Sequence, residues 1–333
     1  MNIVTQKTES VKREKEKKTA KETWSQKKAA SAIVAEKMFK AGFKARAYRM
    51  KECARLLTMK TCPECGHSTG SSAVLCRDRI CPTCQWRLSL KRYVQMVQAL
   101  GKIQDIDDYH AMFLTLTVKN CWGSRLREEL GRMSESWNRL LQRRPVKKVV
   151  AGWARSLEIT YNEEKGTFHP HYHVILLIEP DCNMTFGELQ YNFNEWWRLS
   201  ARLLYKPITD IRNIVDLSPE EDNKKLGTAI TETFKYAVKD STLIEMPMTA
   251  FSQYVEAVDG KRMVAYGGII KEARKELGID DDELEGDTTA DVCRECGGMM
   301  VQEVLEWSFT EKTYKRIKEA AGVGNKRSEV NER

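Results

Sequence analysis

The chain has 333 residues, of which 41% are hydrophobic and 31% charged, and its formal net charge is +8. This composition is typical of a globular protein, and the longest purely aliphatic run, residues 174–178, is far shorter than the roughly 20 apolar residues needed to cross a bilayer. A membrane-spanning role is therefore excluded. Because the N-terminus lacks the apolar core of a secretory signal, we expect a cytoplasmic protein with no membrane partner.

The positive charge is concentrated at the N-terminus. Residues 1–50 hold 14 lysines and arginines against five glutamates, a net +9, so the rest of the chain sums to −1. A basic arm of this kind either follows nucleic-acid phosphates or is simply a solvated segment. Residues 20–57 contain no proline and space their apolar side chains as a helix does, which predicts one or two helices. The arm and these helices form a first region, residues 1–57.

The ten cysteines favour metal binding, because disulfides are rare in a reducing compartment. Cys62-x-x-Cys65 and Cys81-x-x-Cys84 have the ligand spacing of a zinc ribbon, with Cys76 as an alternative ligand. We therefore predict a structural Zn²⁺ in an N-terminal zinc-ribbon-like module.

The module spans residues 58–105 and ends in a helix from Trp86 to about Ile103. Farther along, Cys293-x-x-Cys296 is half a site, which could close with another pair, bind zinc between two chains or have no metal role. The remaining cysteines, Cys53, Cys121 and Cys182, are predicted to pack in the core.

A pattern of strands interleaved with helices follows over residues 106–245. Alternation and β-branched residues predict strands at 113–118, 154–161, 169–178 and 208–215, and residues 162–166 form a hairpin connection. Helices are predicted at 125–143, 186–205 and 219–239, the last opened by Ser218 and Pro219. The order predicts an α+β fold with a central antiparallel sheet flanked by helices. Residues 246–333 form a C-terminal region with weaker signals and an acidic linker at 280–291.

Three of the five histidines fall within five residues: His169, His171 and His173. Alternate residues of a strand point to one face, so the three imidazoles form a row. Such a row can bind a divalent ion, although a surface strand with coincidental histidines is the alternative. Glu158 on the preceding strand could supply an oxygen ligand, or it could pair with an arginine. Nitrogen and oxygen ligands with open positions suit Mg²⁺ or Mn²⁺ acting on phosphate.

A second group of reactive side chains lies in the predicted helix 219–239. Glu232, Tyr236 and Lys239 would share one face, because they are spaced i, i+4 and i+7. A tyrosine hydroxyl has a pKa of about 10, so a phenolic nucleophile needs help from a metal or from a cation such as Lys239. Glu232 is placed to take a proton from a second nucleophile, such as water. An ordinary solvated helix face is the alternative.

Three motifs together resemble those of plasmid rolling-circle replication initiators in the HUH endonuclease superfamily, the group with one tyrosine and a glutamate four residues before it. They are residues 113–120 (FLTLTVKN), 169–176 (HPHYHVIL) and 232–240 (ETFKYAVKD), in the family's order. The Cys-rich segment 76–84 is also similar to that group.

The resemblance implies a metal-dependent endonuclease and strand transferase with a sheet of the HUH type. Tyr236 would cut one strand of single-stranded or extruded origin DNA, leaving a 5′-phosphotyrosine and a 3′-OH primer, and the protein would rejoin or release strands at termination. His171 and His173 correspond to the metal ligands, and His169 could support them. Glu232 would activate water at termination. A host helicase and polymerase are the expected partners, since the sequence contains no nucleotide-binding P-loop.

Basic residues around the cysteines could contact the DNA backbone. They are Arg77, Arg79, Arg87, Lys91 and Arg92. Trp137, Trp196 and Trp197 could stack on bases, although tryptophans at helical spacing more often belong to a core. Two alternatives remain: an HUH transposase or mobilisation relaxase, and a non-enzymatic zinc-ribbon DNA-binding regulator. The regulator would leave the histidine row and the Glu232–Tyr236 pairing unexplained.

Overall fold

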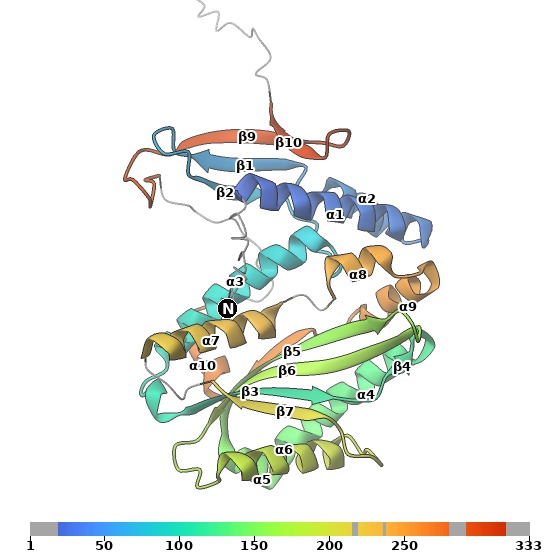
Figure 1. Ribbon diagram of the computed structural model, residues 1–333, viewed down its shortest axis with the longest axis vertical. Coiled ribbons are helices and arrows are strands. Elements are labelled where there is room, and N and C mark those ends of the chain that lie inside the picture. Colours follow the sequence, from blue (N-terminus) through green and yellow to red (C-terminus); the bar gives the residue numbers. More distant parts are fainter. Residues whose placement is uncertain (1–18, 215–218, 236–237, 280–290, 318–333) are drawn as a thin grey trace, which may run out of the picture. The chain divides into compact units, whose positions relative to one another are not determined.

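The computed structural model describes residues 19–214, 219–235, 238–279 and 291–317 (Figure 1). Most of the basic arm, most of the acidic linker, Ser218 and Tyr236 lie outside these residues. The chain divides into two compact units: unit 1 comprises Met1–Gln26, Leu56–Ser72 and Asp287–Arg333, and unit 2 comprises Lys27–Arg55 and Ala73–Gly286. Among the described residues, no helix is both long enough and apolar enough to traverse a bilayer.

Unit 1 is built on a four-stranded sheet with the order β10-β9-β1-β2. Its strands are β1 (Leu56–Thr61), β2 (Ser68–Ala73), β9 (Val301–Ser308) and β10 (Thr313–Arg316). Strand β9 runs antiparallel to both β1 and β10. Leu57 faces Leu305 across the β1–β9 pair, and both side chains are buried. The sheet therefore joins strands from opposite ends of the chain.

Unit 2 contains an antiparallel sheet with the order β7-β3-β6-β5-β8, and the short β4 pairs with the start of β6. The strands are β3 (His110–Thr117), β4 (Cys121–Trp122), β5 (Val150–Asn162), β6 (Thr167–Ile178), β7 (Thr209–Asn213) and β8 (Val264–Gly267). The predicted strands and the hairpin between β5 and β6 are confirmed, as is the α+β class. The sheet also includes β8, so it extends beyond residue 245.

Alternation along the strands gives this sheet two apolar faces. Leu114, Tyr172 and Val174 belong to one core, which α4 (Gly123–Gln142), α5 (Arg144–Val149), α6 (Phe186–Ser200) and α9 (Met248–Val258) cover. Phe113 and Ile175 belong to the other core, covered by α3 (Pro82–Lys102), α7 (Pro219–Phe234) and α10 (Gly268–Glu276) (Figure 1). The central strand β6 is therefore covered by helices on both faces.

The predicted N-terminal helices are α1 (Ala20–Lys40) and α2 (Lys44–Glu52), and a 3₁₀ turn, η1 (Ile106–Asp108), precedes β3. Two lysines of α1 hold the ends of α8 (Asp240–Glu245). Lys27 pairs with Asp240 at 2.5 Å in the first turn of α8, where a carboxylate is favoured by the helix dipole. Lys37 donates to the carbonyl oxygens of Leu243 and Ile244 at 2.8 Å. Helix α1 therefore fixes the position of α8.

The predicted helix 219–239 is wrong at its C-terminal end. Helix α7 ends at Phe234, and a new helix, α8, begins at Asp240. The reason lies in the packing: Phe234 is buried in the core beneath α3 and α10, whereas Val238 is buried in the core on the other face of the sheet. One straight helix could not place both side chains, so Glu232 and Lys239 do not share a helix face.

Candidate active site

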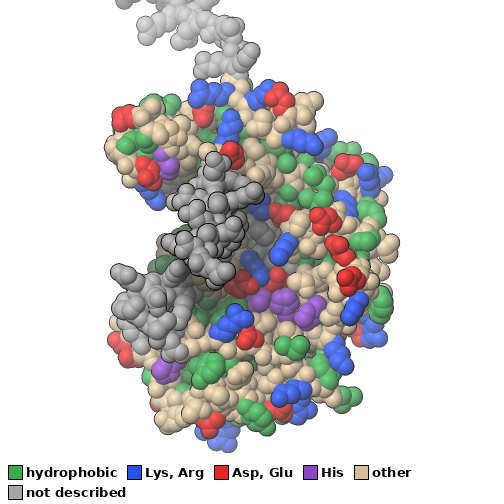
Figure 2. Space-filling model, in the orientation of Figure 1, with side chains coloured by type: hydrophobic (Ala, Val, Ile, Leu, Met, Phe, Trp, Pro, Cys, Tyr) green, Lys and Arg blue, Asp and Glu red, His purple; other side chains and the backbone are tan. Residues whose placement is uncertain are grey.

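The histidine row lies on β6, the central strand of the unit 2 sheet. His171 and His173 share the face of Ile175, which α3, α7 and α10 cover, while Tyr172 packs into the opposite core. Histidine side chains reach the molecular surface beside acidic and basic side chains (Figure 2). Strand alternation therefore places the imidazoles together, as the sequence predicts.

Glu158 completes the group from the neighbouring strand. The antiparallel register places Glu158 directly opposite His171. Its Oε2 lies 2.7 Å from Nε2 of His173 and 3.3 Å from Nε2 of His171. The three ligand atoms lie within 4.8 Å of one another, a spacing at which they could hold a metal ion.

Both imidazoles are oriented through their other nitrogen. Nδ1 of His171 lies 3.2 Å from the carbonyl oxygen of His169, and Nδ1 of His173 lies 3.3 Å from the hydroxyl of Thr115. The ring of Phe113 stacks on that of His173 at 5.3 Å. Hydrogen bonds at Nδ1 leave Nε2 directed at Glu158, which is how metal-ligating histidines are held. His169 thus supports the group through its backbone, and its own ring is not one of the three ligands.

Lys235 faces the same carboxylate, a contact that the sequence analysis missed. Its ammonium lies 3.0 Å from Oε2 of Glu158 and also pairs with Glu232. Oε1 of Glu232 lies 4.0 Å from Nε2 of His173. The spacing of Lys235 three residues after Glu232 was a usable signal, because i, i+3 side chains meet on a helix.

Charge is balanced inside this group. Burial by itself would raise the pKa of Glu158, but hydrogen bonds with the two imidazoles and with Lys235 outweigh burial and hold that pKa well below its usual value. Burial likewise would lower the pKa of Lys235, but the two carboxylates beside it raise that pKa. Glu158 is therefore an anion and Lys235 a cation at neutral pH.

The predicted nucleophile is not described by the structure, and its lysine lies outside the histidine group. Tyr236 lies outside the described residues, next in sequence to Lys235. Lys239 is exposed and precedes α8 as its N-cap. Its predicted role at the phosphate stays a prediction.

The donor set fits a divalent cation. One carboxylate oxygen and two imidazole nitrogens converge, and these are ligands that Mn²⁺ and related ions accept. The ammonium of Lys235 contacts the same oxygen of Glu158, so a metal ion bound there would share this carboxylate with the lysine. Three protein ligands would leave coordination positions open for phosphate oxygens.

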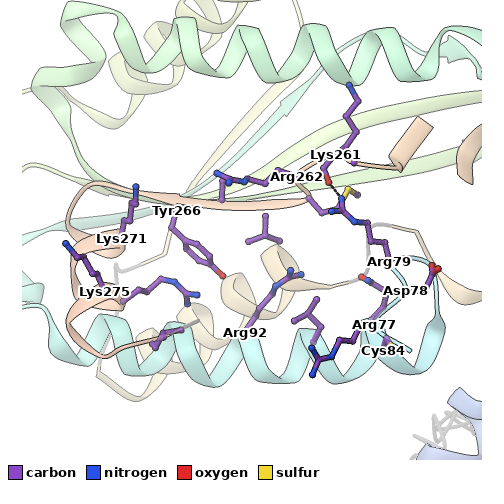
Figure 3. A pocket seen from close by; sticks show the side chains of 18 residues that line it. Arg77, Asp78, Arg79, Cys84, Arg92, Lys261, Arg262, Tyr266, Lys271 and Lys275 are labelled. Carbon is purple, nitrogen blue, oxygen red and sulfur yellow. Dashed lines mark hydrogen bonds between the residues drawn. The ribbon is translucent and has the colours of Figure 1, made fainter. Parts of the chain in front are cut away.

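A basic pocket of about 810 Å³ lies elsewhere in unit 2, lined by α3, β8, α10 and the segments that precede α3 and β8 (Figure 3). Eight of its lining residues are basic: Arg77, Arg79, Arg92, Lys261, Arg262, Lys271, Arg274 and Lys275. Asp78 is the one acidic residue among those that line it, and the guanidinium of Arg46 binds both of its carboxylate oxygens, at 2.8 and 3.0 Å. The pocket is thus strongly electropositive.

Some of the predicted DNA-contact residues line this pocket and others do not. Arg77, Arg79 and Arg92 line the basic pocket, whereas Arg87 and Lys91 are not among its lining residues. The tryptophans proposed for base stacking are core residues: Trp137, Trp196 and Trp197 are all buried. Trp197 donates from Nε1 to the carbonyl oxygen of Thr117 at 2.9 Å.

The cysteines also assemble differently from the prediction. Cys62 and Cys65 form one group with Cys293 and Cys296 in unit 1. Cys81 and Cys84 form another with Cys53 and Cys76 in unit 2. The predicted set of Cys62, Cys65, Cys81 and Cys84 is therefore wrong, because the pairing of β1 with β9 brings in cysteines that are distant in sequence. Cys53, predicted as a packing residue, belongs to the second group.

Comparison with known proteins places the chain among replication proteins. The profile of a family described as "Replication protein" matches residues 69–315. A protein named "Protein rep" from Bacillus amyloliquefaciens is 34% identical over 256 residues, covering 72% of this chain and 75% of that protein. Another "Protein rep", from Streptococcus pneumoniae, is 33% identical over 73% of this chain and 75% of its own length. A third, from Lentilactobacillus hilgardii, is 28% identical over 87% of this chain and 94% of its own. No solved structure matches significantly.

Proposed function

Because the chain belongs to the replication protein family, we propose that it initiates rolling-circle replication of a plasmid by nicking one strand of the origin. The observation that carries this proposal is the convergence of Glu158, His171 and His173 beside Lys235, one residue before a tyrosine. The motifs that resemble those of the HUH endonucleases contain these histidines, the lysine and the tyrosine, in the order found in that superfamily. We further propose that the unit 2 sheet is of the HUH type.

In the proposed reaction, the hydroxyl oxygen of Tyr236 attacks the scissile phosphorus. A bond forms between that oxygen and phosphorus, the bond from phosphorus to the 3′ oxygen breaks, and the proton lost by the tyrosine is balanced by one gained by the 3′ oxygen. The products are a 5′-phosphotyrosine and a free 3′-OH, from which a polymerase can extend. The phenol has an ordinary pKa of about 10, so the reaction needs groups that favour phenolate or neutralise the phosphate.

The chain offers those groups on one face of the sheet. Glu158, His171 and His173 would hold Mg²⁺ or Mn²⁺, which supplies charge neutralisation at the phosphate oxygens. Lys235 adds a permanent cation beside Glu158. Thr115 and the carbonyl of His169 keep the two imidazoles in orientation.

Glu232 is proposed to act in a second step, at termination. Its carboxylate lies at the edge of the group, 4.0 Å from His173, and 44% of its side chain is exposed. A carboxylate that solvent can reach is suited to take a proton from water. Water activated in this way would release the strand without a second tyrosine.

We propose that the basic pocket contacts the phosphate backbone of the origin DNA. Eight arginine and lysine side chains line this pocket, and its one carboxylate, Asp78, is paired with Arg46. Such a surface attracts the phosphates of DNA without distinguishing its base sequence. The pocket is lined by α3 and α10, which share with α7 the core on the histidine face of the sheet. A host helicase and a DNA polymerase are the proposed protein partners, since they would supply strand separation and synthesis.

The test is a nicking assay on supercoiled plasmid that carries the origin, with Mn²⁺ or Mg²⁺. We expect wild-type protein to relax the plasmid and to remain attached to the 5′ end, and Tyr236→Phe and chelator each to abolish both. Tyr191→Phe, which removes the hydroxyl of an exposed tyrosine on α6, is the matched control and should nick normally. Binding of the origin by wild type and Tyr236→Phe with no cutting by either would overturn the nuclease and favour a DNA-binding regulator.

A further inference from the structure

Eight of the ten cysteines lie in two separate groups of four. One group, in unit 1, consists of Cys62, Cys65, Cys293 and Cys296. The other, in unit 2, consists of Cys53, Cys76, Cys81 and Cys84. We propose that each group binds one zinc ion through four thiolates, so that the chain carries two structural zinc ions in addition to any metal at the histidines.

The sulfur positions match tetrahedral zinc. Four thiolates about 2.3 Å from a zinc ion lie about 3.8 Å from one another. In unit 1, the sulfur of Cys296 lies 3.4 Å from those of Cys62 and Cys65, and Cys65 lies 3.6 Å from Cys293. A disulfide would need a separation of about 2.05 Å, and all ten thiols are free.

The unit 2 sulfurs have the same spacing. The sulfur of Cys84 lies 3.5 Å from that of Cys53 and 3.6 Å from that of Cys76. Cys81 lies 3.7 Å from Cys53. Thiols packed only as apolar side chains would have no reason to converge four at a time on one point.

The unit 1 site is formed by two copies of the same turn. Cys62-Pro-Glu-Cys65-Gly66 and Cys293-Arg-Glu-Cys296-Gly297 share the pattern C-x-E-C-G. In each turn the glycine N–H donates to the first cysteine's carbonyl oxygen at 2.9 Å. Gly66 and Gly297 have φ angles of +73° and +77°, which glycine adopts without steric cost. Each turn therefore presents two sulfurs in the same way.

The sheet brings these two turns together. The first turn directly follows β1, and the second precedes β9. Because β1 and β9 are antiparallel, with Thr61 opposite Val301, the end of β1 lies beside the start of β9. The geometry is that of a zinc ribbon assembled from two distant segments.

The unit 2 site has polar groups that suit a buried anionic centre. A zinc ion with four thiolates carries a net charge of −2, which burial would penalise. The Ser31 hydroxyl lies 3.4 Å from the sulfur of Cys81, and the N–H of Cys76 donates to the sulfur of Cys53 at 3.4 Å. Lys28 is fully buried, and its ammonium donates to the carbonyl oxygen of Cys53 at 2.6 Å. Its charge would offset that of the site.

The test is the metal content of the full-length protein, purified without added zinc or chelator and measured by mass spectrometry of the elements. We expect two zinc ions per chain in the wild type. Cys293→Ser/Cys296→Ser and Cys81→Ser/Cys84→Ser should each retain one. Cys121→Ser/Cys182→Ser is the matched control, because neither cysteine belongs to a group, and it should retain two.

Three results would overturn the proposal. The first two are fewer than two zinc ions in the wild type and iron in place of zinc. The third is a Cys293→Ser/Cys296→Ser variant that keeps all its zinc while Cys81→Ser/Cys84→Ser loses all of it, as a single site built from Cys62, Cys65, Cys81 and Cys84 requires. Should a variant not fold, Co²⁺ loaded into the wild-type protein gives a second readout: two equivalents should develop the absorption of a tetrahedral four-thiolate centre. None of these measurements involves DNA, so they stand whether or not the protein nicks an origin.

Discussion

The ammonium of Lys235 lies 3.0 Å from Oε2 of Glu158, the same oxygen that Nε2 of His173 approaches to 2.7 Å. The next residue in the chain is Tyr236. One lysine therefore connects the histidine group with the segment that carries the tyrosine. Lys235, and not Lys239, is therefore the lysine that we expect to act at the phosphate.

Replacing Lys235 with methionine should slow origin nicking on the order of 100-fold, because a positive charge next to the reacting phosphate is lost. Lys239→Met is the comparison, since Lys239 is exposed and lies four residues farther along. We expect it to affect the rate much less. Single-turnover cleavage of an origin oligonucleotide measures the rates of both variants. A larger loss of rate in Lys239→Met would instead assign the role of the cation at the phosphate to Lys239, as the sequence predicts.

Glu232→Gln should separate the two halves of the reaction. The first cleavage uses the tyrosine, so it should persist, while release of the strand by water should slow by about 10² to 10⁴-fold. Covalent protein–DNA complex should therefore accumulate over time on a denaturing gel. Equal slowing of cleavage and release would show that Glu232 acts instead in binding or in the first step.

Thr115→Val should weaken metal binding without removing a ligand. The variant keeps the shape of the side chain and loses the hydroxyl 3.3 Å from Nδ1 of His173. Loss of such an orienting partner typically costs about 10 to 100-fold in metal affinity. The Mn²⁺ concentration for half-maximal nicking should rise accordingly, and saturating Mn²⁺ should restore most of the rate. Thr249→Val, at an exposed position on α9 on the opposite side of the sheet, should leave the titration unchanged.

If the basic pocket contacts DNA phosphates, removing its charges should reduce the salt dependence of DNA binding. Lys271→Ala/Lys275→Ala removes two exposed cations from its α10 side. The slope of log affinity against log salt should fall by up to about 1.8 on duplex or about 1.4 on single strands. Lys147→Ala/Lys148→Ala, on α5 of the opposite face, removes the same charge and should leave the slope unchanged. Equal effects of the two pairs would mean that the pocket makes no particular contact.

Lys37→Met should destabilise the protein by about 1–3 kcal/mol, because the carbonyl groups at the end of α8 lose their donor. Lys40→Met, on the same helix, removes only an exposed i, i+4 pair with Glu36, so it should change the free energy of unfolding much less. Denaturant unfolding measures both free energies. Equal values would indicate that the contacts between α1 and α8 add little.

The local sequence pattern was sufficient to predict most strands of the unit 2 sheet. The alternation in β3, β5 and β6 depends on each strand alone, so the shared face of His171 and His173 could be predicted from the sequence, as could the placement of Glu158 near them. Lys235 was not predicted as a contact, because the sequence analysis assumed one continuous helix. The end of α7 depends on which core buries Phe234 and Val238, and helix periodicity does not contain that information.

The grouping of the cysteines, in contrast, could not be predicted from the local sequence. Spacing correctly indicated that C-x-x-C pairs belong together, but it joined neighbouring pairs along the chain. Cys65 and Cys293 lie 228 residues apart and meet only because β1 pairs with β9. Likewise Cys53, the residue that follows α2, meets Cys84 in the first turn of α3, and no motif surrounds Cys53 in the sequence. Contacts between segments that are distant in sequence therefore decide which cysteines meet.

The split of unit 1 into distant segments also sets an order of events during synthesis. Strand β1 leaves the ribosome long before β9, and at about 5–20 residues per second the delay is roughly 10–50 s. For that time β1 can pair with β2 only, and Leu57, later buried against Leu305, faces an open strand edge. Residues 73–286, most of unit 2, are made in this interval, so the unit 2 sheet can fold first. A ribosome that stops before residue 301 would therefore release a chain with the unit 2 sheet and an open strand edge at β1, which is a target for aggregation and for cellular proteases.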